Sequence, residues 1–351
     1  MKNKVDSLYI HIPFCKSICT YCDFVREVVK CQRQEDDYII KICSQINKEC
    51  KHKFKTIYIG GGTPNSLSDT NLNLLLSTCK KIKAKDCELT VECNPEFINN
   101  NQANIFKKFG VNRISLGVQT LNKKINKIFN RKHSNQDVIN AIKILRKNNI
   151  ENISLDFIYG YDLLKLKDIE NNVKFIVNNK IPHSSFYSLE IKENSILAKQ
   201  KYQINDELID SQFKYIIDMM KKYKYQRYEV SNWCIKKKYQ CKHNLAYWNT
   251  YDWKSIGLGA YGLENKNYYY YSGNTTNFKK VNTKYSDKDY YFQVIMMGFR
   301  LIKGLDLKNP NHVKAFNFFK DKIDPKLITI TKNNIKVKNV NQLDNILLSL
   351  I

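Results

Sequence analysis

Short runs rich in β-branched and aromatic residues alternate with longer amphipathic stretches over the first two thirds of the chain. Strands are predicted at residues 7–12, 55–59, 88–92, 113–119, 153–158 and 184–191. Helices are predicted at residues 35–51, 68–83, 101–109, 135–148, 167–179 and 206–222. Such alternation implies βαβ units that build a parallel sheet with right-handed crossovers. Six units predict an α/β fold in which the sheet forms an open, partial (β/α)6 barrel.

The residue composition of the chain changes after residue 224. Trp233, Trp248 and Trp253 appear, followed by a run of tyrosines at 268–271. The last part of the chain has the pattern of a small unit of helices and short strands that ends in a short helix. We therefore predict a barrel domain at residues 1–224 and a smaller C-terminal α+β domain at residues 225–351.

The chain is strongly basic, with a formal net charge of +25 from 58 basic residues, of which 51 are Lys and 7 are Arg. Such a charge by itself suggests a nucleic-acid or other anionic partner. Specific recognition of phosphates and bases depends on Arg, however, and an AT-rich coding sequence enriches Lys and Asn. We expect no dedicated nucleic-acid surface, and a basic nucleic-acid-binding protein is kept as an alternative.

Cysteine usage and apolar runs bear on the compartment. Eleven cysteines, an odd number, are scattered along a chain long enough to bury a core. This usage is typical of a reducing cytoplasm and not of a disulfide framework. The longest apolar runs, such as residues 294–299, are far shorter than the ~20 residues that cross a bilayer. We expect a cytoplasmic protein without a membrane span.

Cys15, Cys19 and Cys22 form a C-x3-C-x2-C motif in the loop after the first predicted strand. Three thiolates at this spacing can bind three irons of a [4Fe–4S] cluster and leave the fourth iron open to another ligand. The loop follows the carboxyl end of a strand, where barrel active sites lie. The alternative is a structural zinc site that adds His11 to the three cysteines. No second pair of ligands is evident nearby, so the spacing favours iron–sulfur.

The surroundings of this motif resemble the radical S-adenosylmethionine (SAM) superfamily, since residues 9–15 read Tyr-Ile-His-Ile-Pro-Phe-Cys. The chain is most similar to the branch that contains oxygen-independent coproporphyrinogen III oxidase and the HemW-type heme chaperones. Further motifs match that branch in order: Gly-Gly-Gly-Thr-Pro at 60–64, Glu-Cys-Asn-Pro at 92–95, Asn-Arg-Ile-Ser-Leu-Gly-Val-Gln at 112–119, Arg-Lys-His at 131–133, Asp-Phe-Ile-Tyr-Gly at 156–160 and Tyr-Glu-Val-Ser-Asn at 228–232.

The resemblance implies that the three cysteines hold a [4Fe–4S] cluster and that SAM binds beside it. It assigns Gly61, Gly62 and Thr63 to the methionyl end of SAM, where glycine allows a close backbone approach. It assigns Glu92 to the ribose hydroxyls. Other residues are placed on the SAM and substrate side of the barrel, namely Tyr9, Tyr21, Gln119, Arg131 and Asp156. The carboxylate of Asp156 lies in an apolar strand and needs a polar partner. No catalytic residue is assigned.

Three features separate the chaperones of this branch from the oxidases. The oxidases have a further cysteine at the position of Phe24. They also carry a longer N-terminal extension, whereas 14 residues precede Cys15 here. Residues 243–248 read His-Asn-Leu-Ala-Tyr-Trp and match the H-N-x-x-Y-W motif typical of the chaperones. All three features favour a heme chaperone, and a radical enzyme of the coproporphyrinogen oxidase type is the alternative.

The H-N-x-x-Y-W motif contains groups that suit heme. The neutral imidazole of His243 is a good axial ligand for heme iron. The rings of Tyr247 and Trp248 offer aromatic faces to a flat macrocycle, and Asn244 completes the predicted heme site. The alternative is that His243 is satisfied within an aromatic core. The expected partners are heme and a protein that accepts it, and a homodimer is left open.

Overall fold

The computed structural model describes residues 5–339 and 342–351. Its centre is a twelve-stranded sheet that contains all six predicted strands as neighbours in chain order, each parallel to the next. They are β1 (Ser7–Ile12), β4 (Phe54–Gly61), β5 (Lys83–Cys93), β6 (Arg113–Gln119), β7 (Asn152–Tyr159) and β8 (His183–Ser188). The predicted α/β fold with an open parallel sheet is confirmed.

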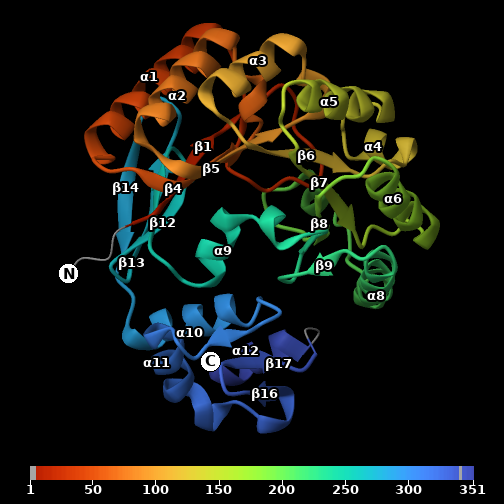
Figure 1. Cartoon of the computed structure of the whole chain (residues 1–351), viewed down its shortest axis with the longest axis vertical. Coiled ribbons are helices and arrows are strands. Elements are labelled where there is room, and N and C mark those ends of the chain that lie inside the picture. The colour runs from red at the N-terminus through yellow and green to blue at the C-terminus, as the bar shows by residue number, and fades with distance from the viewer. Residues whose placement is uncertain (1–4, 340–341) are drawn as a thin grey trace.

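The six predicted helices follow these strands and lie on the outer side of the curved sheet (Figure 1). They are α1 (Gln32–Glu49), α2 (Asp69–Ile82), α3 (Asn100–Phe109), α5 (Asn135–Lys147), α6 (Leu166–Asn178) and α8 (Asp206–Lys222). Each buries one apolar face, as an amphipathic helix does. The starts of α2 and α5 are capped by Ser68 and Ser134, whose side chains accept backbone N–H groups. Two short helices, α4 (Lys123–Ile128) and α7 (Ile196–Lys199), were not predicted.

The sheet continues beyond the predicted six strands on both edges. On one edge β11 (Trp253–Ile256) pairs in parallel with β1, and β12 (Tyr261–Glu264), β13 (Asn267–Gly273) and β14 (Phe278–Thr283) follow in antiparallel order. On the other edge lie β10 (Asn232–Cys234) and β9 (Gln226–Arg227). The tyrosine run therefore forms a strand, for which aromatic residues are well suited. The sheet crosses the expected boundary between residues 224 and 225, and that division into domains stays a prediction.

The remaining elements are short. A two-stranded pair, β2 (Phe14–Cys15) and β3 (Glu27–Val28), flanks the cysteine loop. Helix α9 (Lys242–Trp248) lies on the inner side of the sheet (Figure 1). Single turns of 3-10 helix occur at Pro64–Ser66, Pro95–Phe97, Lys237–Tyr239, Lys320–Lys322 and Pro325–Leu327.

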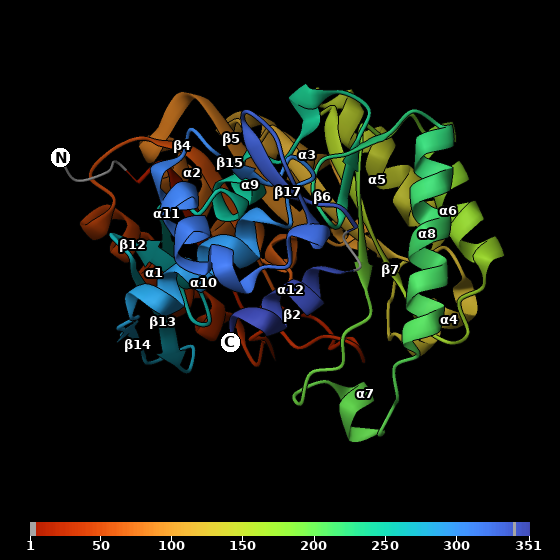
Figure 2. The ribbon, with the colours of Figure 1, turned by 90° about the horizontal axis from the view of Figure 1, so that it is seen from below.

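The C-terminal part is a small α+β unit with its own apolar core. It contains α10 (Asp287–Gly298), α11 (Pro310–Phe319) and α12 (Leu343–Leu350), together with a sheet of β15 (Leu305–Asp306), β16 (Ile328–Ile330) and β17 (Asn334–Val337). Seen from below, this unit lies in front of the large sheet (Figure 2). Residues of β11, β12 and β13 pack into the same core, so the unit is joined to the sheet by apolar contacts.

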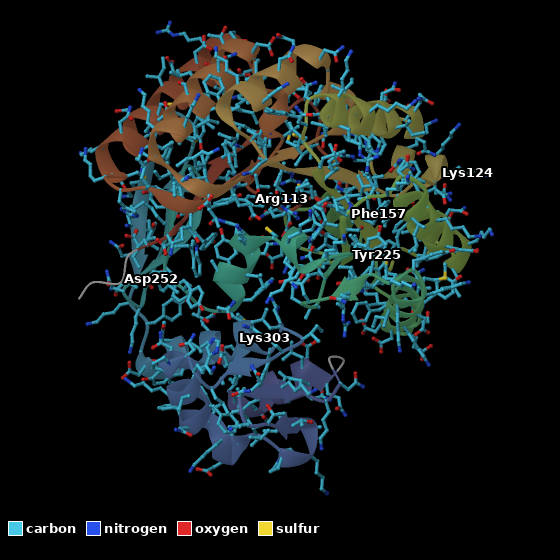
Figure 3. The ribbon with its side chains drawn as sticks, viewed as in Figure 1. Arg113, Lys124, Phe157, Tyr225, Asp252 and Lys303 are labelled. Atoms are coloured by element: carbon cyan, nitrogen blue, oxygen red, sulfur yellow. The ribbon has the colours of Figure 1, made fainter. Side chains whose placement is uncertain are left out.

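The main core lies between the sheet and its outer helices. Leu8, Ile10 and Ile12 of β1 are fully buried in it, as a parallel strand covered on both faces requires. Phe157 of β7 lies in the interior, whereas Lys124 points outward at the rim (Figure 3). Among the described residues, no helix has both the length and the apolar character needed to cross a membrane.

We expect Ile10→Ala to lower the free energy of unfolding by about 3 kcal/mol, because it removes buried methylene and methyl groups and leaves a cavity. Ile10 is 0% exposed on a central strand. Ile40 on α1 is 57% exposed, so Ile40→Ala is the matched control and should change stability by no more than about 0.5 kcal/mol. Urea denaturation of the two variants checks this, and equal effects would contradict the assigned core.

Candidate functional site

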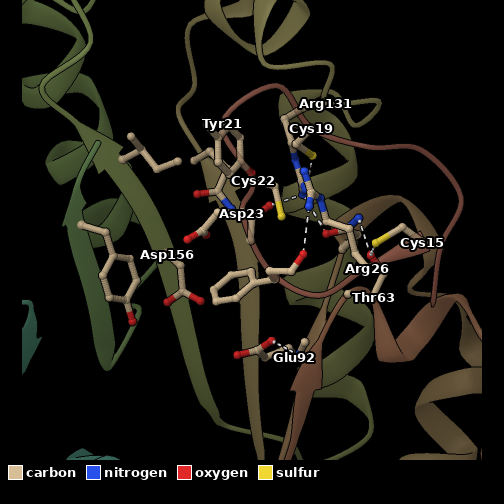
Figure 4. A pocket seen from close by; sticks show the side chains of 18 of the residues that line it. Cys15, Cys19, Tyr21, Cys22, Asp23, Arg26, Thr63, Glu92, Arg131 and Asp156 are labelled. Carbon is tan, nitrogen blue, oxygen red and sulfur yellow. Dashed lines mark hydrogen bonds between the residues drawn. The ribbon is translucent and has the colours of Figure 1, made fainter. Parts of the chain in front are cut away.

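The carboxyl ends of the parallel strands meet at one edge of the sheet and surround a cavity of about 460 Å³. Most of the residues predicted to bind the cluster and SAM line this cavity (Figure 4). They are Cys15, Cys19, Tyr21, Cys22, Gly61, Gly62, Thr63, Glu92, Gln119, Arg131 and Asp156. Residues from strands far apart in the chain are thus brought together, as the rule for the carboxyl edge of parallel sheets predicts. Tyr9 and the residues of the H-N-x-x-Y-W motif do not line it.

The cysteine loop is held in place by the segment that follows α4. The side-chain amide of Asn130 donates to the carbonyl of Ile18 at 2.8 Å, and the backbone N–H of Thr20 donates to Phe129 at 3.2 Å. Asn130 has a positive φ of 57°, a conformation that Asn tolerates better than most residues. The edge of the Tyr21 ring packs against Phe129, with ring centroids 5.0 Å apart. These contacts present the cysteines to the cavity.

Cys15 and Cys19 each have a polar neighbour from another part of the chain. The hydroxyl of Thr63 lies 3.5 Å from the sulfur of Cys15, and a guanidinium nitrogen of Arg131 lies 3.6 Å from the sulfur of Cys19. Burial raises the pKa of Cys15 and raises that of Cys22 to about 12. Both are therefore thiols at neutral pH, and a bound metal would have to displace their protons.

The cavity wall fits an anionic or metal-bound group. Three free thiols lie on this wall. In the described part of the chain, the Nε atoms of Arg26 and Arg131 are buried and have no hydrogen-bond partner. Both side chains line the cavity, so donors remain available on its wall. Among the described residues, no three His, Cys, Asp or Glu side chains gather around one point as the ligands of a single ion do.

His11 is not placed to complete a zinc site. It is buried on β1, with one ring nitrogen 2.8 Å from the carbonyl of Val25 and the other 3.0 Å from the hydroxyl of Tyr9. Burial lowers the pKa of His11 to about 4, so its ring is neutral and needs one acceptor and one donor. Both nitrogens are thereby engaged, and the hydroxyl of Tyr9 is turned to His11 and away from the cavity.

The glycines at the end of β4 are required by close packing of the protein itself. Gly61 has a φ of +113°, and a Cβ atom there would lie 2.6 Å from the ring of His11. A Cβ atom on Gly62 would lie 2.7 Å from the carbonyl oxygen of Phe14. Glycine is the residue that permits both the positive φ and the close approach. These glycines thus let the end of β4 pack closely against β1 and β2, and they also line the cavity.

Two carboxyl groups lie at the other side of the cavity (Figure 4). Glu92 accepts the hydroxyl of Tyr58 at 2.7 Å and the backbone N–H of Gly61 at 3.1 Å. Asp156 accepts the hydroxyls of Ser115 at 2.7 Å and Ser154 at 2.9 Å, which are the polar partners that its apolar strand required. Burial raises the pKa of Asp156 and raises that of Glu92 to about 7, and the nearby Asp156 carboxylate adds to the Glu92 shift.

Arg131 crosses from the loop after α4 to the wall of the cavity. Besides Cys19, its guanidinium donates to the side-chain oxygen of Asn94 at 2.8 Å and to the carbonyl of Gly117 at 2.5 Å. Gln119, which ends β6, has a positive φ of 65° and turns the chain at the cavity rim. Arg131 therefore ties the cysteine loop to the ends of β5 and β6.

His243 lies inside an aromatic core and not on the cavity wall. Its side chain is buried, with the residue 1% exposed. One ring nitrogen lies 2.8 Å from the hydroxyl of Thr56, and the other lies 2.5 Å from the hydroxyl of Tyr247. Both nitrogens are engaged within the protein, which fits the alternative of a satisfied core histidine, and the heme role of His243 stays a prediction. Asn244, Tyr247 and Trp248 of the same motif are partly buried.

Several residues of the cavity were missed from the sequence, including Arg26, Tyr58, Asn94, Ser115, Tyr187 and Lys192. Tyr58 and Ser115 lie on predicted strands, where every second residue faces inward, so strand periodicity was a signal that could have found them. Tyr187 also lies on a predicted strand, whereas Lys192 lies beyond the end of β8 and carried no comparable signal.

Comparison with known proteins agrees with this geometry. The family model described as the radical SAM superfamily matches residues 9–176. Coproporphyrinogen III oxidase (HemN) from Escherichia coli has a similar fold, with a TM-score of 0.81 and 17% identity over 98% of this chain and 89% of that chain. The residues matched by the family model include the three cysteines of the loop, Glu92 and Asp156.

Curated relatives indicate which family the chain belongs to. The heme chaperone HemW of Buchnera aphidicola subsp. Acyrthosiphon pisum is 35% identical over 86% of this chain and 85% of its own length. The heme chaperones HemW of Bacillus subtilis and Escherichia coli are 33% and 32% identical, each over 73% of this chain and over 70% and 69% of their own lengths. The chain belongs to the HemW heme chaperone family within the radical SAM superfamily.

The raised pKa of Glu92 makes a prediction about stability. A carboxyl group whose pKa rises from 4.5 to about 7 on folding destabilises the folded state progressively as pH rises through that interval. Glu92→Gln removes this titration while its amide oxygen can still accept a hydrogen bond. We expect the stability of the native protein relative to the variant to fall by roughly 2 to 3 kcal/mol between about pH 5 and about pH 8.

Urea denaturation of both proteins across this pH range measures the effect. The groups that face Glu92 are the phenols of Tyr9, Tyr58, Tyr187 and Tyr247 and the carboxyl of Asp156. All are present in both proteins, so they cancel to first order. A stability difference that does not change with pH would show that Glu92 keeps an ordinary pKa.

Proposed function

We propose that the chain is a heme chaperone that carries a [4Fe–4S] cluster and SAM in the cavity at the carboxyl edge of its sheet. The observation that supports this most is the convergence of three free thiols, a glycine turn and two carboxyl groups on one cavity. The HemW relatives are named as heme chaperones, and these names support the proposal that this chain binds heme.

Cys15, Cys19 and Cys22 would hold the cluster, which when bound with SAM supplies one-electron chemistry that side chains cannot. Gly61, Gly62 and Thr63, which line the cavity, would receive the methionyl end of SAM. On the opposite wall, hydroxyl-bearing groups of a nucleoside would meet the buried carboxyl of Glu92, with Asp156 beside it. Tyr21, Gln119 and Arg131 close the cavity around these groups.

Heme would bind outside the interior of the barrel. His243 offers no free nitrogen, so we assign no axial ligand to it. The partly buried Asn244, Tyr247 and Trp248 of α9 and the exposed Tyr251 are the groups of this region that we propose for contact with the macrocycle. Heme would then pass to an acceptor protein, whose identity and any homodimer of the chain stay open.

The proposed cellular location is the cytoplasm. All eleven cysteines are free in the structure, and seven besides the cluster ligands are buried. Free cysteine behaves there as a small apolar residue, which suits a reducing compartment.

Replacing Cys19 with Ser should abolish assembly of the cluster, because two thiolates do not hold a [4Fe–4S] core stably in place of three. Cys31 is an exposed cysteine outside the motif, so Cys31→Ser is the matched control and should retain full iron content. The measurement is iron and sulfide per chain after anaerobic reconstitution. Full cluster content in Cys19→Ser would remove Cys19 from the ligand set.

Titration of the reconstituted protein with heme tests the function itself. We expect about four irons per chain from the cluster and, in addition, saturable binding of heme followed by the heme absorbance. Transfer to an apo-hemoprotein would then complete the test. A protein that holds its cluster and SAM but binds no heme would instead be a radical enzyme of the coproporphyrinogen oxidase type, and SAM cleavage would be sought.

A further inference from the structure

Polar residues on the inner side of the sheet connect helix α9 with the cavity. Strands β4 and β5 present alternate residues inward, Thr56 and Tyr58 from one and Glu88 and Glu92 from the other. The first residue of each pair contacts α9, and the second lies on the cavity wall. Two neighbouring strands thus link the helix to the site.

Glu88 and Thr56 fix the position of α9. The buried carboxylate of Glu88 accepts the backbone N–H groups of Lys242 at 3.1 Å and His243 at 3.0 Å, at the start of the helix. The ring of His243 is held between Thr56 at 2.8 Å and Tyr247 at 2.5 Å. An imidazole with both nitrogens bonded in a buried setting has one orientation, because any other leaves polar groups unsatisfied.

The ring of Tyr58 rests on this fixed imidazole. The two ring centroids are 5.1 Å apart and the planes are inclined by 26°. The hydroxyl of Tyr58 then donates to Glu92 at 2.7 Å, while the backbone of Gly61 donates to the other carboxylate oxygen. The orientation of Glu92 therefore depends on Tyr58, and that of Tyr58 depends on His243.

We propose that helix α9 supports the wall of the SAM cavity from behind, and that His243, acting through Tyr58, positions Glu92 for SAM. This inference rests on the proposed function, since it assumes that SAM meets Glu92. His243 and Tyr58 are positioning residues. In this proposal Glu92 contacts SAM, Tyr58 orients Glu92, and His243 orients Tyr58. Tyr247 also packs against the C-terminal core, so α9 contacts that unit as well.

A double-mutant cycle on SAM binding tests the inference. The variants are Tyr58→Phe, which removes one hydroxyl, His243→Ala, and the two combined. Each is reconstituted to equal iron content, and the dissociation constant of SAM is measured by isothermal titration calorimetry. Tyr225→Phe is the matched control, because this buried tyrosine also loses one hydrogen bond, to Ile181, but far from the cavity.

Tyr58→Phe should weaken SAM binding about tenfold, as loss of a hydrogen bond to a charged group does. His243→Ala should weaken it in the same direction, and in the Tyr58→Phe background it should have almost no further effect, because both act on one contact. The Tyr58 hydroxyl also lowers the pKa of Glu92, so in Tyr58→Phe the loss of SAM affinity on acidification should begin at a higher pH.

The outcomes separate this inference from the proposed function. If the native protein with a full cluster does not bind SAM, the proposed function fails. If it binds SAM but Tyr58→Phe and His243→Ala bind equally well, or their effects simply add, the positioning role is wrong. Should His243→Ala not fold, Tyr247→Phe takes its place in the cycle, since it removes only the hydroxyl on the second nitrogen of His243. Unchanged SAM affinity in that variant would also overturn the inference.

Discussion

Two buried carboxylates on one face of β5 organise the inner side of this fold. A desolvated carboxylate is costly unless hydrogen bonds satisfy it. Glu88 meets this requirement with the backbone N–H groups at the start of α9, and Glu92 meets it with Tyr58 and the backbone of Gly61. The first set of bonds brings a helix into the barrel, and the second shapes one wall of the cavity.

A second constraint is the close approach of the end of β4 to strands β1 and β2. The positive φ of Gly61 and the contact of Gly62 with the carbonyl of Phe14 leave no room for a side chain. On the far side of the loop, Arg131 binds Asn94, Gly117 and Cys19 together. The cysteine loop is therefore held on one side by the glycines at the end of β4 and on the other by Arg131. Such positioning is the preorganisation that a bound cluster requires.

Sequence reasoning recovered the parts of the fold and site that depend on local patterns. The strand at 113–119 and the helix at 135–148 follow from the periodicity of short segments. The cysteine spacing and the ordered motifs located eleven residues that now line one cavity. It missed the pairing of β11 with β1 and the strand made by the tyrosine run, because both depend on partners far away in the chain.

What the sequence determined by itself is the class of chemistry, since thiols at C-x3-C-x2-C spacing and glycines at a strand end are properties of short segments. What only the tertiary structure decided is the environment of His243. Its motif indicated a heme ligand, but Thr56 and Tyr247 occupy both nitrogens of a buried ring. Whether an imidazole is open to a ligand depends on which other side chains satisfy it, and one of the two here, Thr56, comes from a strand 187 residues away in the chain.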